Sequence, residues 1–416
     1  MNIILVAAAI FVFTYALISI GSIPKLRIDR GMAAALGGVM MVLFGIVSLI
    51  DLPGLIDLNV IFLLLGMMLL VAGLEFSGFF RIVSDLLIKR SGSRVMLLAY
   101  IMVICAVLSA VALNDAVVLI FTPVVIRCCR RTKSNPIPYL IGVMFSANIG
   151  SLATFVGNPQ NAYIASHSGI SFIDFSAHTL PIALVCLPIA FFIIYAMFRK
   201  SLVSDDPVPP GGDDTEVDRI RLWAVVTIMI GALAGFALSG MFGVQTYEVA
   251  LAAGVLALAV VMSESPKNIV WAAKRVNWNV LIFFIGLFIL MGGIVESGLL
   301  NQVASVFPGF GEGGTPSVIG VAAFSAVLSN LVSNVPAVML IANMIPEGDM
   351  MLWFALAASS TLAGNTTLIG SAANVIVAER SEEEGITFSF WKFAMIGVPV
   401  TLLTLFVAVG ILMLMS

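Results

Sequence analysis

The stretch VMLLAYIMVICAVLSAVALNDAVVLIFTPVVI, residues 95–126, is predominantly apolar and contains one charged residue, Asp115. A carboxylate inside a membrane segment costs on the order of 3 kcal/mol on insertion scales. The stretch has 32 residues with basic residues on both flanks, whereas two full crossings of a bilayer need about 40. It therefore predicts a re-entrant hairpin of two half-length helices, with Asn114 and Asp115 at its tip.

The composition places this hairpin in a polytopic membrane protein. The chain has 416 residues, of which 61% are hydrophobic and 10% are charged, and its mean hydropathy is +1.13. No soluble core needs that much apolar surface. With a net charge of −3 and no basic face, the chain is not expected to bind nucleic acid. Its expected surroundings are the lipid bilayer.

The basic residues predict the topology. All 20 lysines and arginines fall into six clusters, and such clusters face the cytoplasm. We therefore expect a multi-pass protein of the cell membrane, with these loops and the polar linker at 201–220 on the cytoplasmic side. The apolar segment 1–21 is expected to be a transmembrane helix and not a signal peptide. Spacing of the clusters predicts about ten transmembrane helices, with both termini outside.

Three more segments interrupt the regular crossings. Segment 317–345 is bounded by glycines and acidic residues and is again too short for two crossings, so it predicts a second hairpin. Segments 138–165 and 350–377 contain the helix-breaking sequences GNPQN at 157–161 and GSAAN at 370–374. Both are predicted to be broken helices. The fold class is thus all-α, with two re-entrant hairpins and two broken helices.

The two halves of the chain resemble each other at an offset of about 220 residues. NVIFLLLGMMLLVAGLEFSG at 59–78 aligns with NVLIFFIGLFILMGGIVESG at 279–298, and LSAVALNDAVVLI at 108–120 aligns with LSNLVSNVPAVML at 328–340. The linker places the second half in the opposite orientation. The predicted domains are a first inverted repeat at 1–200, a cytoplasmic linker at 201–220 and a second inverted repeat at 221–416.

Inverted repeats with broken helices are typical of secondary transporters, whose substrate site lies near the midplane where the repeats meet. Pseudo-symmetry brings both hairpin tips and both helix breaks together there. Unwound backbone frees N–H and C=O groups, and asparagine supplies both a donor and an acceptor without a fixed charge. The candidate substrate- and ion-binding residues are Asn114, Asp115, Asn148, Thr154, Gly157, Asn158, Asn161, Ser333, Asn334, Asn365, Thr367, Gly370, Ser371 and Asn374.

Asp115 is the charged residue among these candidates, and two roles are open for it. It carries a proton, or it is an acidic ligand for Na+, which would then lie near Asn114, Asp115 and Gly157. Its repeat partner is Val335, so Asp115 makes the two hairpins unequal and is expected to set which ion, H+ or Na+, drives transport. No cofactor is predicted. An enzyme is disfavoured, because the chain has neither an HExxH pattern nor a second aspartate nearby.

The motifs LNDAVVLIFTPVVI, SANIGSLATFVGNPQNAYIA and SNVPAVML resemble the hairpins and broken helices of the ion transporter superfamily. That group includes arsenite permeases and related anion permeases, citrate and dicarboxylate carriers, and NhaD-type antiporters. The resemblance covers nearly the whole chain. It implies a homodimer with a scaffold domain and a transport domain that moves as an elevator. It implies a first binding site at Asn114, Asp115, Gly157 and Asn158, and a second at Ser333, Asn334, Gly370 and Ser371.

Three functions remain open. The first is a secondary transporter for a small inorganic or organic anion or an oxyacid, with arsenite or antimonite efflux as the specific case, because Asp115 does not repel a neutral acid. The second is a Na+/H+ antiporter that uses Asp115. The third is a dicarboxylate or tricarboxylate symporter, although the tips lack the Ser-Asn-Thr sequence of sodium-coupled carriers. The chain has no nucleotide-binding motif, so an arsenite pump would need a separate ATPase subunit.

Overall fold

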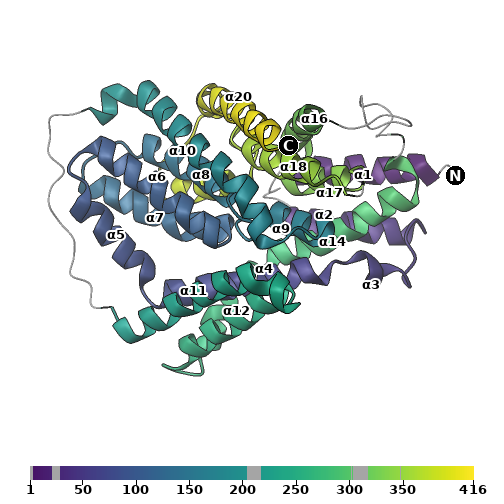
Figure 1. Cartoon of the computed structure of the whole chain (residues 1–416), viewed down its shortest axis with the longest axis horizontal. Helices are drawn as coiled ribbons and strands as arrows, with labels where there is room; N and C mark the ends of the chain where they lie inside the picture. The colour runs from purple at the N-terminus through teal and green to yellow at the C-terminus, as the bar shows by residue number, and fades with distance from the viewer. Residues whose placement is uncertain (1–2, 21–28, 204–216, 301, 303–316, 347) are drawn as a thin grey trace.

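The structure is a computed structural model, and every regular element in the part of the chain that it describes is a helix (Figure 1). Six of these helices are long and apolar enough to cross a membrane, and five further apolar helices have 10–17 residues. The prediction of an all-α membrane protein with several crossings is thus confirmed. The described residues are 3–20, 29–203, 217–300, 302, 317–346 and 348–416.

The first half contains the predicted hairpin and broken helix, but the hairpin is longer than expected. Its two helices have 18 residues each and are therefore about 27 Å long at roughly 1.5 Å per residue, so the prediction of half-length helices was wrong. The broken helix is interrupted between Ser151 and Pro159, as GNPQN predicts. The helices are α1 (Ile3–Ile20), α2 (Arg30–Leu43), α3 (Leu52–Leu55), α4 (Leu58–Phe76), α5 (Phe79–Arg90), α6 (Arg94–Val111), α7 (Asn114–Arg131), α8 (Pro136–Ser151), α9 (Pro159–Ser168) and α10 (Phe172–Leu202).

The second half repeats this order. Its hairpin turns at Ser333, which has a φ of +79°, and its broken helix is interrupted between Ala363 and Ala372. Residues 204–216 of the predicted linker lie outside the described residues, and the predicted repeat boundaries remain predictions. The helices are α11 (Arg219–Phe242), α12 (Thr246–Met262), α13 (Asn268–Arg275), α14 (Trp278–Glu296), α16 (Val318–Val332), α17 (Asn334–Ala342), α18 (Met350–Ala363), α19 (Ala372–Glu382) and α20 (Phe390–Met415).

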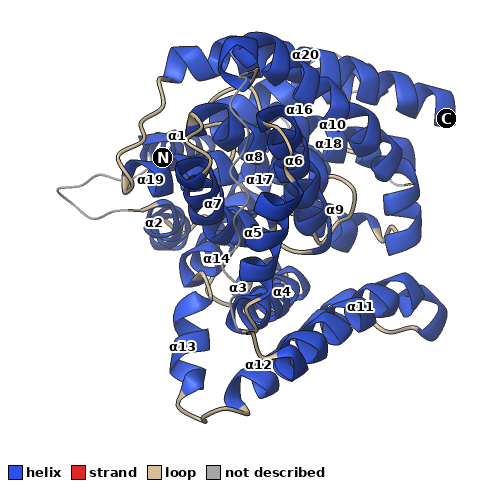
Figure 2. Cartoon of the chain, turned by 90° about the vertical axis from the view of Figure 1, so that its left-hand side faces the viewer, coloured by secondary structure: helices blue, strands red, loops and turns tan. Residues whose placement is uncertain are grey.

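The helices of the two halves pack in reciprocal pairs. Helix α2 packs on α14, and their repeat counterparts α12 and α4 pack on each other. Helix α7 packs on α19, and α17 packs on α9 in the same way. Figure 2 shows α11, α12 and α13 on one side of α4 and α14, with α16, α18 and α20 on the other. This pairing is what a twofold relation between the repeats requires.

Two glycines at equivalent positions of the repeats permit the closest of these crossings. A Cβ on Gly66 of α4 would clash with the backbone of Ala250 in α12, and a Cβ on Gly286 of α14 would clash with the backbone of Ala34 in α2. The helix backbones touch at both places. The sequence alignment pairs Gly66 with Gly286, so the repeat seen in the sequence is also present in the packing.

Candidate functional site

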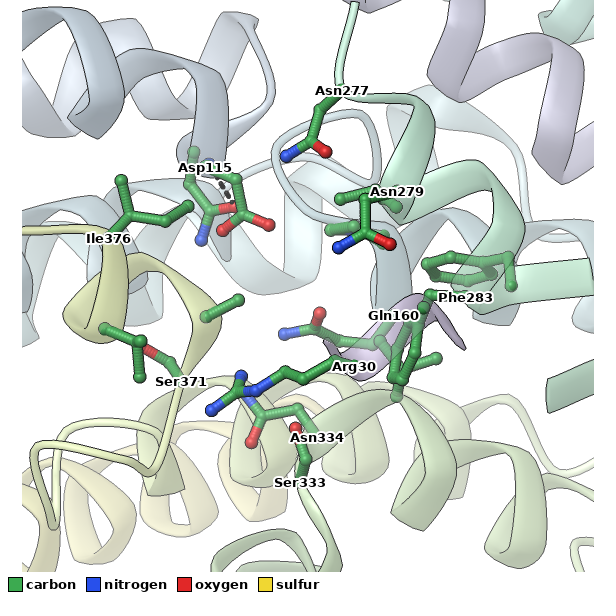
Figure 3. A pocket seen from close by; sticks show the side chains of 18 of the residues that line it. Arg30, Asp115, Gln160, Asn277, Asn279, Phe283, Ser333, Asn334, Ser371 and Ile376 are labelled. Carbon is green, nitrogen blue, oxygen red and sulfur yellow. Dashed lines mark hydrogen bonds between the residues drawn. The ribbon is translucent and has the colours of Figure 1, made fainter. Parts of the chain in front are cut away.

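A cavity of about 290 Å³ lies where both hairpin tips and both broken helices meet (Figure 3). The tips reach it from α7 and α17, and the broken helices reach it through the first residues of α9 and α19. The remaining wall is formed by the N-terminal ends of α2 and α14. We call this space the central cavity. Its polar lining residues are Asp29, Arg30, Asn114, Asp115, Asn148, Gln160, Asn277, Asn279, Ser333, Asn334, Ser371 and Glu379.

The structure brings six of the fourteen predicted residues to the surface of this cavity. They come from both hairpin tips and from both broken helices. The other eight lie behind this surface, at the helix breaks, and most of them bind backbone groups that the breaks set free. The six lining residues are Asn114, Asp115, Asn148, Ser333, Asn334 and Ser371.

The break between α8 and α9 is tied to the first hairpin through backbone groups. The Asn114 N–H donates to the carbonyl of Gly157 at 2.8 Å. A Cβ on Gly157 would lie 2.6 Å from the carbonyl oxygen of Ser109, so no larger residue fits there without movement. The Thr154 hydroxyl donates to the carbonyl of Ala110 at 2.5 Å. Thr154 and Gly157 therefore hold the tip in place and do not line the cavity.

Asn158 and Asn161 stabilise the start of α9. The Asn158 side chain accepts from the Asn161 N–H at 2.9 Å and donates to the Ser151 hydroxyl at 2.9 Å. Both asparagines are fully buried. Their side chains bind backbone N–H and C=O groups that a broken helix would otherwise leave without hydrogen-bond partners.

The second break is held by its own asparagines and joined to the first. The Asn374 side chain donates to the carbonyl oxygens of Gly364 and Thr367 at 2.8 and 3.1 Å, and the Gly370 N–H donates to Thr367 at 3.0 Å. Asn148 of α8 connects the two breaks. Its side-chain nitrogen lies 2.9 Å from Asn365 Oδ1, 3.1 Å from Ser371 Oγ and 3.2 Å from Asn374 Oδ1.

Arg30 is one of six polar lining residues that the sequence analysis missed, and the others are Asp29, Gln160, Asn277, Asn279 and Glu379. Arg30 is the first residue of α2, and its side chain extends into the central cavity beside Gln160 and the tip residues Ser333 and Asn334 (Figure 3). Its guanidinium makes no ion pair or hydrogen bond with any residue that the structure describes. In the sequence, Arg30 belongs to a basic cluster that marks one side of the membrane. No local motif distinguishes it from a surface arginine.

The central cavity is lined by this one arginine and by three carboxylates. Asp29 caps α2 by accepting from the Met32 N–H at 2.9 Å. Asp115 on α7 and Glu379 on α19 line the cavity without an ion pair to Arg30. With all four groups ionised the formal balance is −2. A solute with two or three negative charges would meet net repulsion here.

The backbone around the cavity favours oxygen atoms of a solute. Five helices, α2, α7, α9, α17 and α19, begin with a residue that lines it. A helix N-terminus carries about half a positive charge and free N–H donors. The Asn334 side chain is 6% exposed, and its oxygen has no hydrogen-bond partner among the described residues. That oxygen is therefore an unused hydrogen-bond acceptor in a residue of the cavity wall.

No group of three or more His, Cys, Asp or Glu side chains is arranged to hold a metal ion in the described part of the chain. The four cysteines, Cys105, Cys128, Cys129 and Cys186, are buried and unpaired. The position predicted for Na+, near Asn114, Asp115 and Gly157, remains a prediction.

A second cavity, of about 630 Å³, follows the central one along α7 and α19. On α7 the central cavity touches Asp115, and the second cavity touches Leu119 to Arg127. On α19 the central cavity touches Glu379 and the second touches Arg380. The second cavity is lined by arginines from four of the basic clusters, so it lies at the side of the molecule where those clusters gather. These arginines are Arg81, Arg127, Arg275 and Arg380.

Comparison with known proteins gives concordant results. A profile described as citrate transporter matches residues 10–358. The "46 kDa membrane protein" of Mycobacterium leprae is 31% identical, over 97% of this chain and 96% of its own length. The "Silicon efflux transporter LSI3" of Oryza sativa subsp. japonica is 28% identical, over 94% and 93%. The crystal structure of the Alcanivorax borkumensis YdaH transporter shares the fold, with a TM-score of 0.55 at 16% identity over 99% of this chain and 98% of that one.

Proposed function

The chain belongs to the citrate transporter family, within the ion transporter superfamily that its motifs indicate, and we propose that this membrane transporter moves small uncharged oxyacids. Arsenous acid and orthosilicic acid are the two solutes we propose first, because both are weak acids that carry no charge at neutral pH. The rice relative is named a silicon efflux transporter, which supports this class and supports efflux as the direction. No catalytic role is proposed.

The observation that carries this proposal is the charge balance of the central cavity. Three carboxylates face one arginine, so the fixed charges disfavour citrate and other multivalent anions. A neutral acid avoids that cost. Its oxygen atoms accept from Arg30 and from the helix N-termini, and its hydroxyl groups donate to Asp115, Glu379 and the free Asn334 oxygen.

We propose that the two hairpins and the two broken helices move together as the transport domain. Helices α2, α4, α12 and α14 form the scaffold, because they pack in reciprocal pairs whose backbones touch at Gly66 and Gly286. An elevator motion then carries the solute past the scaffold, and a homodimer holds the scaffold still in the bilayer. Asp115, at the hairpin tip, is the residue that we propose binds the coupling ion, H+ or Na+.

The test is a ligand screen on purified protein by thermal unfolding, at constant pH, with and without Na+. A solute at 100 times its Kd should stabilise the folded state by about 2.7 kcal/mol. Arsenous or silicic acid should raise the Tm of the wild type, and citrate should not. Stabilisation by citrate, with no effect of either neutral acid, would overturn the proposal.

One observation favours a second candidate, a Na+/H+ antiporter. The surplus of carboxylates around Arg30 suits a cation better than a multivalent anion. Repeating the screen at several pH values separates the two candidates, because an antiporter is stabilised by Na+, progressively less at low pH where protons compete, and is stabilised by neither oxyacid.

A further inference from the structure

The central cavity uses only one end of the scaffold. Its scaffold residues are Arg30 at the start of α2 and Asn277 and Asn279 at the start of α14. The other two scaffold helices, α12 and α4, begin at the opposite end of the scaffold. That second end has no part in the cavity in this conformation.

The repeat identifies the counterparts of these residues. Gly286 contacts Ala34 of α2, and its repeat counterpart Gly66 contacts Ala250 of α12. Ala34 and Ala250 are therefore counterparts, and residues of α2 and α12 correspond at an offset of 216 positions. Helices α4 and α14 correspond at 220 positions, because the sequence alignment pairs Gly66 with Gly286. The counterparts of Arg30, Asn277 and Asn279 are therefore Thr246, Asp57 and Asn59.

The end of the scaffold with Asp57 is covered by the transport domain. The Ser166 hydroxyl donates to Asp57 Oδ2 at 2.6 Å, and His167 Nδ1 lies 3.7 Å from the same oxygen. Both residues are in the last turn of α9, which packs on α4. Asn59 is exposed and lies outside the central cavity.

At the other end of the scaffold the equivalent contact is open. The breaks GNPQN and GSAAN align at 213 positions, which makes Glu379 and Arg380 of α19 the counterparts of Ser166 and His167. Glu379 lines the central cavity and Arg380 lines the second cavity, and neither bonds to Asn277. One end of the molecule is closed by α9, and the other is open along α19.

We propose that Asp57 and Asn59 form a second contact site for the same oxyacid. The hairpin tips reach this site when the transport domain moves from one end of the scaffold to the other. This inference rests on the proposed function. When α9 leaves Asp57, the hairpin tips take its place, and Asn59 contacts the solute as Asn279 does in this conformation. Pro159 lies at the central cavity and Ser166 at Asp57, and seven helical residues span about 10 Å at roughly 1.5 Å per residue. That distance sets the scale of the movement.

The two ends differ in charge, so the apparent affinity for the solute should differ between the two sides of the membrane. Thr246 stands where the open end has Arg30, and Asp57 stands where it has Asn277. Asp29 offsets Arg30 at the open end, and its counterpart at the closed end is the neutral Gln245, so the scaffold contribution is one charge unit more negative at the closed end. Solute oxygens that accept from Arg30 find no cationic donor there, so we expect tighter binding at the open end than at the closed end.

The first test is a reversible crosslink. Asp57→Cys and Ser166→Cys are combined in a background in which the four buried native cysteines are replaced by alanine. Oxidation should lock the observed conformation, abolish flux of arsenous acid in proteoliposomes and leave the Kd of the solubilised protein unchanged within about twofold. Reduction should restore the flux of the same sample, which shows that the protein remained folded. Oxidant should leave the flux of each single-cysteine variant at its untreated value.

The second test compares repeat counterparts. In the locked protein Asn279→Leu should weaken binding about tenfold, the effect of losing a hydrogen bond of roughly 1.4 kcal/mol, whereas Asn59→Leu should leave the Kd unchanged. In the reduced protein both variants should slow flux. Undiminished flux in the crosslinked protein, or in Asn59→Leu, would overturn the second site while leaving the proposed function in place. If the parent protein neither binds nor moves any oxyacid, the proposed function fails, and the second site fails with it.

Discussion

At the scale of single residues, the site joins an arginine and an aspartate that come from different parts of the chain. Asp115 sits at the start of α7, and Arg30 sits at the start of α2. They face the same cavity of about 290 Å³ without forming an ion pair. An arginine without an ion pair among the described residues is ready to donate to a solute, and a carboxylate in the same position is ready to bind a proton, a cation or a solute hydroxyl.

Replacing Arg30 by glutamine should weaken oxyacid binding without unfolding the protein. A hydrogen bond from a charged donor contributes about 1.5–3 kcal/mol, so the Kd should rise roughly ten- to hundredfold. Arg30→Lys keeps the charge but loses the planar fork, and its Kd should lie between the two. Titration calorimetry measures all three proteins. Equal affinity of the wild type and Arg30→Gln would show that the arginine does not touch the solute.

Asp115→Asn should separate binding from coupling. The amide keeps the size of the side chain but can neither carry a proton nor balance a cation. We expect this variant to bind oxyacid with a Kd within about threefold of the wild type, a difference of less than 1 kcal/mol. Its flux should no longer respond to an imposed pH or Na+ gradient. Gradient-driven flux in the variant equal to that of the wild type would assign coupling to another group, with Glu379 as the next candidate.

The sequence predicted one of these two charges and missed the other for a physical reason. A lone carboxylate in an apolar stretch is costly wherever it packs, so Asp115 stands out in the sequence alone. Arg30 lies in a basic cluster that the topology already explains, and only the packing of α2 on α14 turns it into the cavity. The glutamine in GNPQN, Gln160, was likewise inside a recognised motif but was not among the candidates.

At the scale of elements, the hairpins and broken helices were predictable because charge and length constrain them, whereas their ends were not. The first hairpin was expected at 95–126 and extends over 94–131, since the arginines at its basic end continue the helix while their charged heads stay in water. Ser93 caps α6 by accepting from the Met96 N–H at 3.2 Å, a polar signal that lies outside the apolar run.

The glycine crossings between scaffold helices give a prediction of their own. Gly66→Ala and Gly286→Ala push a methyl group into a neighbouring backbone, and such overpacking costs about 1–3 kcal/mol. Both variants should lower the Tm of the detergent-purified protein. Gly231→Ala in α11 is the matched control, because nothing lies within 4 Å of its Cβ position and alanine is the better helix former. A Tm of Gly66→Ala at or above that of Gly231→Ala would contradict the close crossing.

At the scale of the whole molecule, the reciprocal packing of the two halves was predictable from the aligned motifs at 59–78 and 279–298 and from the two hairpins. What the sequence could not predict is which end of the scaffold the cavity occupies, because both ends are built from related residues. In the proposed mechanism that choice depends on the position of the transport domain, and in this structure Ser166 of α9 contacts Asp57.

Thiol labelling at the two ends of α12 tests on which side of the membrane the basic loops lie. Val244→Cys and Lys267→Cys place one exposed thiol before and one after this helix in a cysteine-free background. Because Lys267 belongs to a basic cluster, its thiol should react with an impermeant maleimide only in inside-out vesicles, and the Val244 thiol only in right-side-out vesicles. The reverse pattern would place the linker and the basic loops outside the cell.

The most direct test of the proposed function is flux of radiolabelled arsenite into inside-out membrane vesicles at neutral pH, where the solute is arsenous acid. We expect gradient-driven accumulation by the wild type, at least about tenfold less by Arg30→Gln, as the loss of one charged hydrogen bond implies, and no inhibition by excess citrate. Accumulation of citrate in its place, with no uptake of arsenous or silicic acid and no effect of Arg30→Gln, would contradict it.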